Sequence, residues 1–127
     1  MKLKYITITF LLCTSTLFIQ ESKTDLLCGK KWEMKFLEID NQKIPVPESE
    51  FSFWLFFKKD GTQKMNTEDG IAEATWKFSK NQDSILVTVS NGVKRNFALN
   101  KLEKNELILS IKQGRESAIM YLKPLLK

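Results

Sequence analysis

Residues 85–99, ILVTVSNGVKRNFAL, predict two antiparallel β-strands joined by a tight turn. On either side of the turn, the residues that would share one strand face recur at every second position: Ile85, Val87 and Val89 before it, and Val93, Arg95, Phe97 and Leu99 after it. This period of two is typical of a strand with one face in a core. Asn91-Gly92 between the strands predicts a type I′ hairpin, since both residues tolerate a positive φ.

The same alternation predicts six further strands, over residues 32–39, 51–57, 62–65, 72–78, 107–111 and 118–122. In the first of them, the apolar positions change parity near Phe36-Leu37, which predicts a β-bulge there. Lys59-Asp60-Gly61 predicts a second tight hairpin, with Gly61 at positive φ.

Residues 42–50 are expected to form a loop. Pro45 and Pro47 lie in this segment, and proline cannot donate a hydrogen bond to a strand ladder. Asp40-Asn41 is expected to begin the loop as a turn.

About eight strands at short, even spacing predict an all-β fold. Sequential hairpins favour an antiparallel up-and-down meander. Eight strands is also the number at which a barrel closes around a filled or ligand-holding interior, and closure removes strand edges that promote aggregation. Residues 21–127 are therefore expected to form one closed barrel. Its first segment, residues 21–27, is expected to be a tether or a short lid helix.

Residues 1–20 are predicted to be a signal peptide that precedes the barrel. Lys2 and Lys4 come before an apolar run over residues 5–12, and no acidic residue occurs before Glu21. The run is too short to span a bilayer comfortably. A retained membrane anchor and a buried first strand are the alternatives. The leader predicts an extracytoplasmic location, either periplasmic or secreted.

Two cysteines leave lipid anchoring open as a less favoured alternative. Cys13 and Cys28 each follow a pair of leucines, whereas lipid attachment needs a small residue before the cysteine. Once the leader is removed, Cys28 is left without a partner for an internal disulfide, and burial is its expected state.

Four short motifs stand out: LLCGKKW at residues 26–32, FWLFFKKDGT at residues 53–62, TWKF at residues 75–78 and YLK at residues 121–123. They resemble the opening, the apolar strand and turn, the central tryptophan strand and the end of bacterial lipocalin-like domains, a family of small exported calycin-type barrels. The resemblance covers residues 26–123 and implies a pocket-bearing barrel. It also implies that an arginine, Arg115 or Arg95, packs over Trp32.

The composition excludes several classes of function. The chain has no histidine, which removes Ser-His and Cys-His nucleophilic pairs and the commonest metal ligand. Its 20 basic residues, against 15 acidic ones, are nearly all lysines spread among the acids, unlike the clustered basic faces of nucleic-acid binders. No phosphate-binding, dinucleotide-binding or nucleophile-elbow motif occurs. We therefore expect no enzyme activity, cofactor, metal site or nucleic-acid partner.

Candidates for a ligand-binding site lie on the expected inward faces of the strands: Trp32, Met34, Phe36, Phe53, Leu55, Phe57, Trp76, Phe97, Leu109 and Met120. They predict a pocket for a small hydrophobic or amphipathic molecule. The alternative is a fully packed core, and size favours it, because a barrel of roughly a hundred residues has little spare volume. Arg95 shares a face with Phe97, and an inward arginine needs a partner or a polar cavity.

Trp54 and Phe56 are expected to point outward. Cover by Leu26-Leu27 is the favoured arrangement, and exposure as a patch for a protein partner is the other. The sequence thus favours an exported, non-enzymatic lipocalin-like protein that holds a small ligand in its barrel. The alternative is a protein-interaction module, an inhibitor-like or envelope-associated barrel with a packed core.

Overall fold

The structure is a computed structural model that describes residues 22–46 and 52–125. The predicted signal peptide, residues 1–20, lies outside the described residues. Helix α2 spans Lys23–Leu27. The strands follow it in the order β1 (Lys31–Ile39), β2 (Gln42–Pro45), β3 (Trp54–Phe57), β4 (Thr62–Thr67), β5 (Gly70–Phe78), β6 (Ser84–Val89), β7 (Lys94–Glu103), β8 (Glu106–Gln113) and β9 (Glu116–Pro124).

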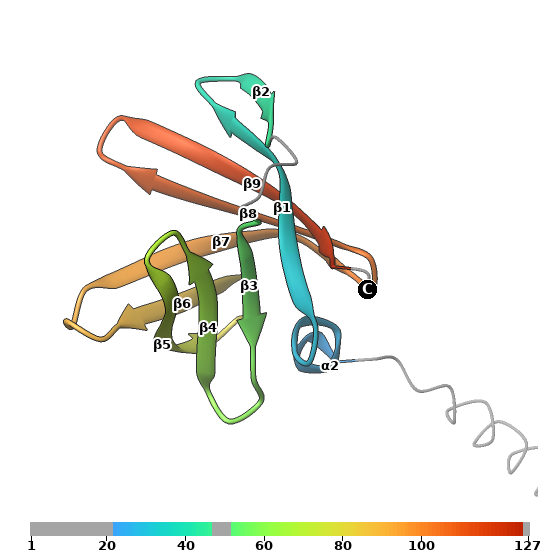
Figure 1. Cartoon of the computed structure of the whole chain (residues 1–127), viewed down its shortest axis with the longest axis vertical. Helices are drawn as coiled ribbons and strands as arrows, with labels where there is room; N and C mark the ends of the chain where they lie inside the picture. Colours follow the sequence, from blue (N-terminus) through green and yellow to red (C-terminus); the bar gives the residue numbers. More distant parts are fainter. Residues whose placement is uncertain (1–21, 47–51, 126–127) are drawn as a thin grey trace, which may run out of the picture.

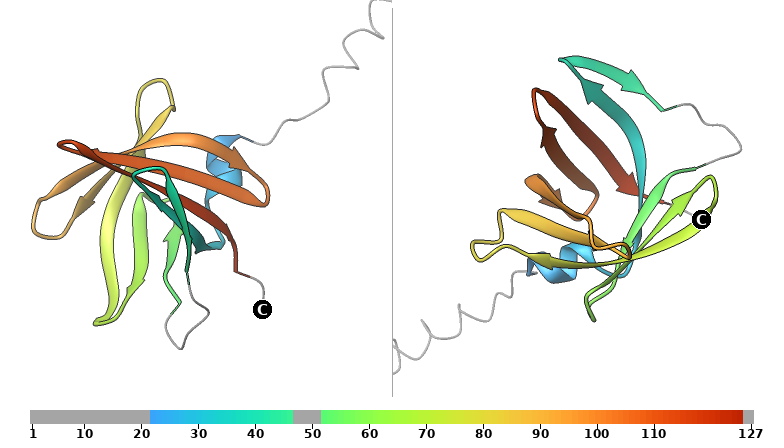
Figure 2. Two further views of the ribbon diagram at one scale, coloured as in Figure 1. Left: turned by 90° about the horizontal axis from the view of Figure 1, so that it is seen from above. Right: turned by 90° about the vertical axis from the view of Figure 1, so that its left-hand side faces the viewer.

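Strand β1 together with β3 to β9 forms a closed antiparallel barrel (Figures 1 and 2). β3 to β9 follow one another as a meander in which each strand pairs with the next. β1 closes the barrel because it pairs with β3 along one edge and with β9 along the other. Trp32 lies opposite Leu55 on the first side, and Met34 lies opposite Leu122 on the second. The predicted all-β fold, with a meander that closes on itself, is confirmed.

The prediction of a loop over residues 42–50 is wrong at its start, where β2 pairs with the far half of β1 (Figure 1). Asp40 and Asn41 have φ values of 52° and 66°, the left-handed pair that a two-residue type I′ hairpin requires. Pro45 fits because Val46 N–H donates to the Lys35 carbonyl at 3.0 Å. With alternation along the strand, the Pro45 nitrogen faces away from β1, where no donor is needed. The rest of the predicted loop, residues 47–50, lies outside the described residues.

The hairpin predicted at Asn91-Gly92 is present, but the prediction that its turn is of type I′ is wrong. Gly92 has a φ of 91° and Asn91 is not among the residues of positive φ. Gly92 N–H donates to the Val89 carbonyl at 2.8 Å, and Val89 N–H to the Val93 carbonyl at 2.9 Å. Three residues therefore connect the paired Val89 and Val93, with glycine in the left-handed last position, which is the next commonest hairpin geometry.

The bulge in β1 lies one residue earlier than predicted. The pairing with β9 shifts register between Met34 and Phe36, so that Phe36 lies opposite Tyr121. Met120 and Leu122, its neighbours in β9, face the interior, so Tyr121 and Phe36 lie on the outer surface. There the two rings meet edge to face with centroids 6.5 Å apart. The prediction of Phe36 as an interior residue is therefore wrong.

One end of the barrel is closed by α2 and Trp32. The Ser22 hydroxyl caps the helix by accepting a hydrogen bond from the Asp25 backbone N–H at 3.1 Å. Leu27 and Trp32 are both fully buried, and the Trp32 indole Nε1–H donates to the Leu27 carbonyl at 2.9 Å. The short helix expected at the start of the domain is confirmed, and it seals the barrel through this bond.

The cation over Trp32 is a lysine, and the arginine implied by the family resemblance is not there. The Lys30 amine lies 5.1 Å from the Trp32 ring centroid and donates to the Lys104 carbonyl at 3.0 Å. Arg115 is exposed in the turn between β8 and β9, and Arg95 lines the interior on β7. Lys30 takes the position because it is only two residues from Trp32 and is held there by the Lys104 carbonyl.

Replacing Trp32 with phenylalanine is expected to lower the free energy of unfolding by about 1–3 kcal/mol. The change leaves the buried Leu27 carbonyl without its donor and leaves a gap where the indole packed. Urea unfolding measures the effect, with Trp54→Phe as the matched control. Trp54 is 9% exposed but lies outside the core cluster, so its substitution removes indole packing without opening the sealed end and is expected to lose less than Trp32→Phe does, about 1 kcal/mol. Equal losses in the two variants would contradict this account of the closed end.

Candidate functional site

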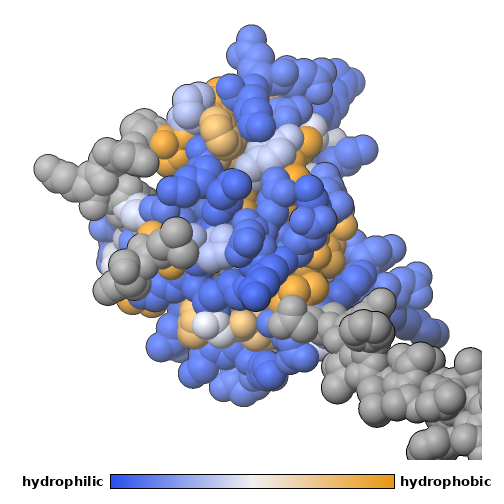
Figure 3. All heavy atoms as spheres, turned by 90° about the vertical axis from the view of Figure 1, so that its right-hand side faces the viewer, coloured by the Kyte–Doolittle hydropathy of each residue, from blue (hydrophilic) through white to orange (hydrophobic). Residues whose placement is uncertain are grey.

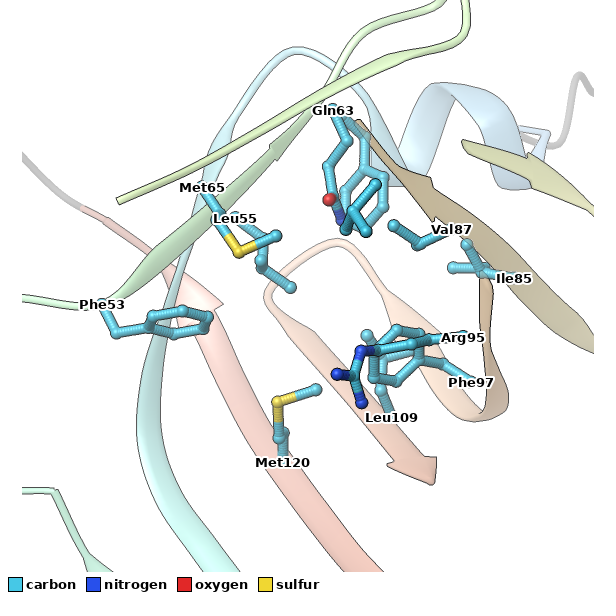
Figure 4. A pocket seen from close by; sticks show the side chains of 12 residues that line it. Phe53, Leu55, Gln63, Met65, Ile85, Val87, Arg95, Phe97, Leu109 and Met120 are labelled. Atoms are coloured by element: carbon cyan, nitrogen blue, oxygen red, sulfur yellow. The ribbon is translucent and has the colours of Figure 1, made fainter. Parts of the chain in front are cut away.

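A cavity of about 230 Å³ lies inside the barrel (Figure 4). For comparison, an apolar cavity of about 150 Å³ in a protein core holds one benzene molecule. Most of the side chains around the cavity are apolar and come from six of the barrel strands: Phe53 just before β3, Leu55, Phe57, Gln63, Met65, Ile85, Val87, Val89, Arg95, Phe97, Leu109 and Met120.

The prediction of a fully packed core, which the size of the barrel favoured, is therefore wrong for this part of the interior. Short side chains contribute to the space. Val87 faces Leu55 and Met65 across the cavity in Figure 4, and a valine reaches less far than the aromatic residues that fill the closed end. Trp32 and Trp76 belong to the packed core cluster and do not line the cavity.

The sequence identified about half of the cavity wall. Six predicted residues line it: Phe53, Leu55, Phe57, Phe97, Leu109 and Met120. Trp32 and Trp76 lie in the core cluster beside the cavity, and Met34 packs against that cluster.

Trp76 packs against Phe57, one of the residues that line the cavity. Its Nε1–H donates to the Lys58 carbonyl at 2.8 Å. Its ring stands edge to face against Phe57 and Phe78, with centroid distances of 5.4 and 5.2 Å. Phe57, which is 1% exposed, is therefore fixed in the wall by a ring that is itself hydrogen-bonded to the backbone.

Gln63 brings a polar group into the apolar wall. It lies on β4 opposite Phe57 and Ala74 and is 2% exposed. Its side-chain Oε1 is buried without a hydrogen-bond partner, and such an oxygen costs about 1–3 kcal/mol of stability. Sequence reasoning missed this residue because glutamine is usually exposed. The available signal was its parity with Met65.

Arg95 is the charged residue of the cavity wall. It lies on β7 opposite Val87, lines the cavity and is exposed, so the cavity meets solvent beside it. Within the described ranges, the carboxylates that form ion pairs do so with lysines, and none pairs with Arg95. Arg95 thus lies on the same side of β7 as Phe97, as its parity indicated, and its exposure to solvent meets the need of an inward arginine for polar surroundings. In Figure 4, Gln63 and Arg95 extend from different strands into the same space.

Trp54 and Phe56 do not form an exposed aromatic pair. Trp54 is 9% exposed, and the Lys31 amine lies 4.4 Å from its ring centroid. Phe56 is half-buried. Leu27 does not provide the cover expected from Leu26-Leu27, since it packs in the core cluster, which does not include Trp54.

The outer surface carries lysines and acids in mixture. Hydrophilic side chains cover most of the face in Figure 3, and hydrophobic ones show between them. The most exposed large hydrophobic residues are Ile39, Ile44, Ile71 and Val93. Ile39 and Ile44 share one face of the β1–β2 hairpin, whereas Ile71 and Val93 lie on β5 and in the turn before β7. In the described part of the chain, no helix has the length and apolar character needed to cross a bilayer.

Cys28 is buried, as expected, and its thiol is free. Burial raises the pKa of the thiol above its ordinary value. Cys28 belongs to the core cluster together with Leu27, the residue directly before it. A leader that ended at Cys28 would remove Leu27 from the core, so the packing disfavours lipid attachment at this position. Cys13 lies outside the described residues.

Comparison with known proteins defines the fold. No model of a known protein family matches the chain, and no curated protein matches it. Among solved structures, the chain is similar to a lipocalin-like protein from Bacteroides uniformis, with a TM-score of 0.59. The fold is lipocalin-like. The match covers 79% of this chain and 99% of the other at 15% sequence identity, and this likeness concerns the lipocalin-like barrel alone.

Replacing Gln63 with methionine is expected to raise the free energy of unfolding of the ligand-free protein by about 1 kcal/mol. Methionine has a similar length and shape and removes the unpaired buried oxygen. Urea unfolding measures the change. Gln42→Met is the matched control, because Gln42 is exposed on β2, and its effect is expected to stay within about 0.5 kcal/mol. A loss of stability in Gln63→Met would contradict the unpaired state of this amide.

The Cys28 thiol is expected to react with iodoacetamide at least about tenfold more slowly in the folded protein than in urea. Burial restricts access, and the raised pKa lowers the fraction of reactive thiolate. The full chain with Cys13→Ser leaves Cys28 as its single thiol, and mass spectrometry follows the labelling. Equal rates with and without urea would place Cys28 at the surface.

Proposed function

We propose that the barrel binds a small apolar or amphipathic molecule in its interior. The observation that carries this proposal is the cavity of about 230 Å³. Its wall is apolar apart from Gln63 and Arg95, and small-molecule sites in proteins combine these properties, an apolar concave wall with a few placed polar groups.

The free energy of apolar burial indicates that both the apolar wall and its polar groups contribute to binding. A chain of eight carbons buried at about 0.8 kcal/mol per CH₂ gains about 6 kcal/mol. Association costs an amount of the same order. Apolar contact alone therefore gives weak binding, and polar contacts in the wall would determine which molecule binds well.

We propose further that the protein is a binding protein without enzymatic activity and that it acts outside the cytoplasm. The first proposal is supported by the lack of histidine in the chain. The second rests on the leader pattern of residues 1–20. The alternative of a protein-interaction module has less support, because it relied on a packed interior and an exposed pair at Trp54 and Phe56.

Binding of N-phenyl-1-naphthylamine, a neutral dye that fluoresces in apolar surroundings, tests the proposed cavity. Val89→Phe is expected to weaken dye binding at least about tenfold, because the larger ring occupies the cavity that Val89 lines. Val93→Phe is the matched control, since Val93 is 44% exposed, and is expected to bind the dye as the unaltered protein does.

Circular dichroism of both variants checks that the barrel is retained. The proposal fails if the unaltered protein does not bind the dye, or if both phenylalanine variants bind it equally.

A further inference from the structure

We propose that the cavity selects an amphipathic acid with polar groups at both ends. Its anionic group pairs with Arg95, its apolar body fills the cavity, and a hydroxyl group at its other end meets the Gln63 amide. This inference rests on the proposed function and deepens it by naming the chemical class of the ligand.

Arg95 provides the site for the anionic group. Its guanidinium is charged at all physiological pH values and presents a planar set of donors that matches a carboxylate. The side chain lines the cavity where the cavity meets solvent, and no carboxylate of the described residues pairs with it. The entrance thus carries a cation whose donors are available to a ligand.

Gln63 provides the second polar contact. It is 2% exposed, lines the same cavity, and its Oε1 has no partner. An amide oxygen accepts hydrogen bonds, so the ligand group that meets it must carry an O–H or N–H. A hydroxyl suits the amide at either of its atoms, because it both donates and accepts.

The placement of the two residues determines the order of groups along the ligand. Gln63 is on β4 and deeply buried, whereas Arg95 is on β7 and exposed. The apolar side chains of Leu55, Met65 and Met120 surround the space into which both extend (Figure 4). An acid group at the entrance, an apolar body and a buried hydroxyl match this order.

Other ligand classes fit the wall less well. A pure hydrocarbon leaves the Gln63 oxygen buried and unpaired, at the cost that such an atom carries. A cationic amphiphile would place its charge beside the Arg95 guanidinium, and like charges in contact repel.

Isothermal titration calorimetry on the full chain with three probes of equal length tests the inference: 8-hydroxyoctanoate, octanoate and octane-1,8-diol. The hydroxy acid is expected to bind at least about tenfold more tightly than the diol, because a charged hydrogen-bonded pair is stronger than a neutral one. It is also expected to bind about threefold to tenfold more tightly than octanoate, which lacks the hydroxyl for Gln63.

Variants assign these preferences to the two residues. Arg95→Gln is expected to weaken binding of both acids at least about tenfold and to leave diol binding unchanged. Gln63→Met is expected to weaken binding of the hydroxy acid and the diol while octanoate binding is retained. Arg115→Gln removes the same charge from the exposed β8–β9 turn and is the matched control, with no expected change for any probe.

The inference is overturned if the diol binds as tightly as the hydroxy acid. It is equally overturned if Arg95→Gln weakens all three probes alike, which is the result of a purely structural role, or if it behaves like Arg115→Gln. In each of these cases, dye binding that depends on Val89 would still support the proposed function. Failure of the dye and of all three probes to bind would refute both proposals together.

Discussion

The pairing of β1 along both of its edges is the interaction on which the remainder of the structure depends. β3 to β9 could form an open meander through consecutive hairpins. The pairs of β1 with β3 and β9 bring the two ends of that meander together. The same strand carries Trp32, whose indole holds the helix that seals one end of the barrel. Closure and sealing thus both come from one strand, and together they shelter the cavity from bulk water.

The interior divides into a tightly packed part and an incompletely packed part. Trp32, Phe57 and Leu27 are at most 1% exposed near the sealed end, and Trp76 braces Phe57 through an edge-to-face contact. Around the cavity the wall includes the short side chains of Val87 and Val89 and a buried amide oxygen of Gln63 without a partner. Empty space and unpaired polar atoms both lower stability. Departures of this kind from the packing rules are expected where a fold serves binding.

The alternation of side chains was enough to predict the strands, the barrel and half of the cavity wall. The strands and their inward faces follow from the period of two in apolar residues, and the barrel follows from the number of strands. β2 was missed because Pro45 and Pro47 argued against a strand, although proline is tolerated where its nitrogen faces away from the neighbouring strand, as at Pro45. Phe36 was placed inside because moving a bulge by one residue exchanges the two faces of a strand.

Gln63 and the cavity could not be predicted for a different reason. A polar residue in a strand is usually on the solvent side, and this expectation outweighed the parity that Gln63 shares with Met65. The volume of a cavity depends on all the side chains that meet around it, and these come from six strands that are distant in the chain. Parity predicts the direction of each side chain but not the space left between them.

The orientation of Pro45 has a consequence for how copies of this protein behave at high concentration. β2 extends beyond the closed barrel and pairs with β1 along one side. Its other side is therefore a strand edge to which a strand of a second molecule could add. The proline nitrogen on that side has no hydrogen to donate, and a strand from a second molecule would lose a ladder bond there. Pro45 therefore disfavours fibril-like association along the edge of β2 that pairs with no other described strand.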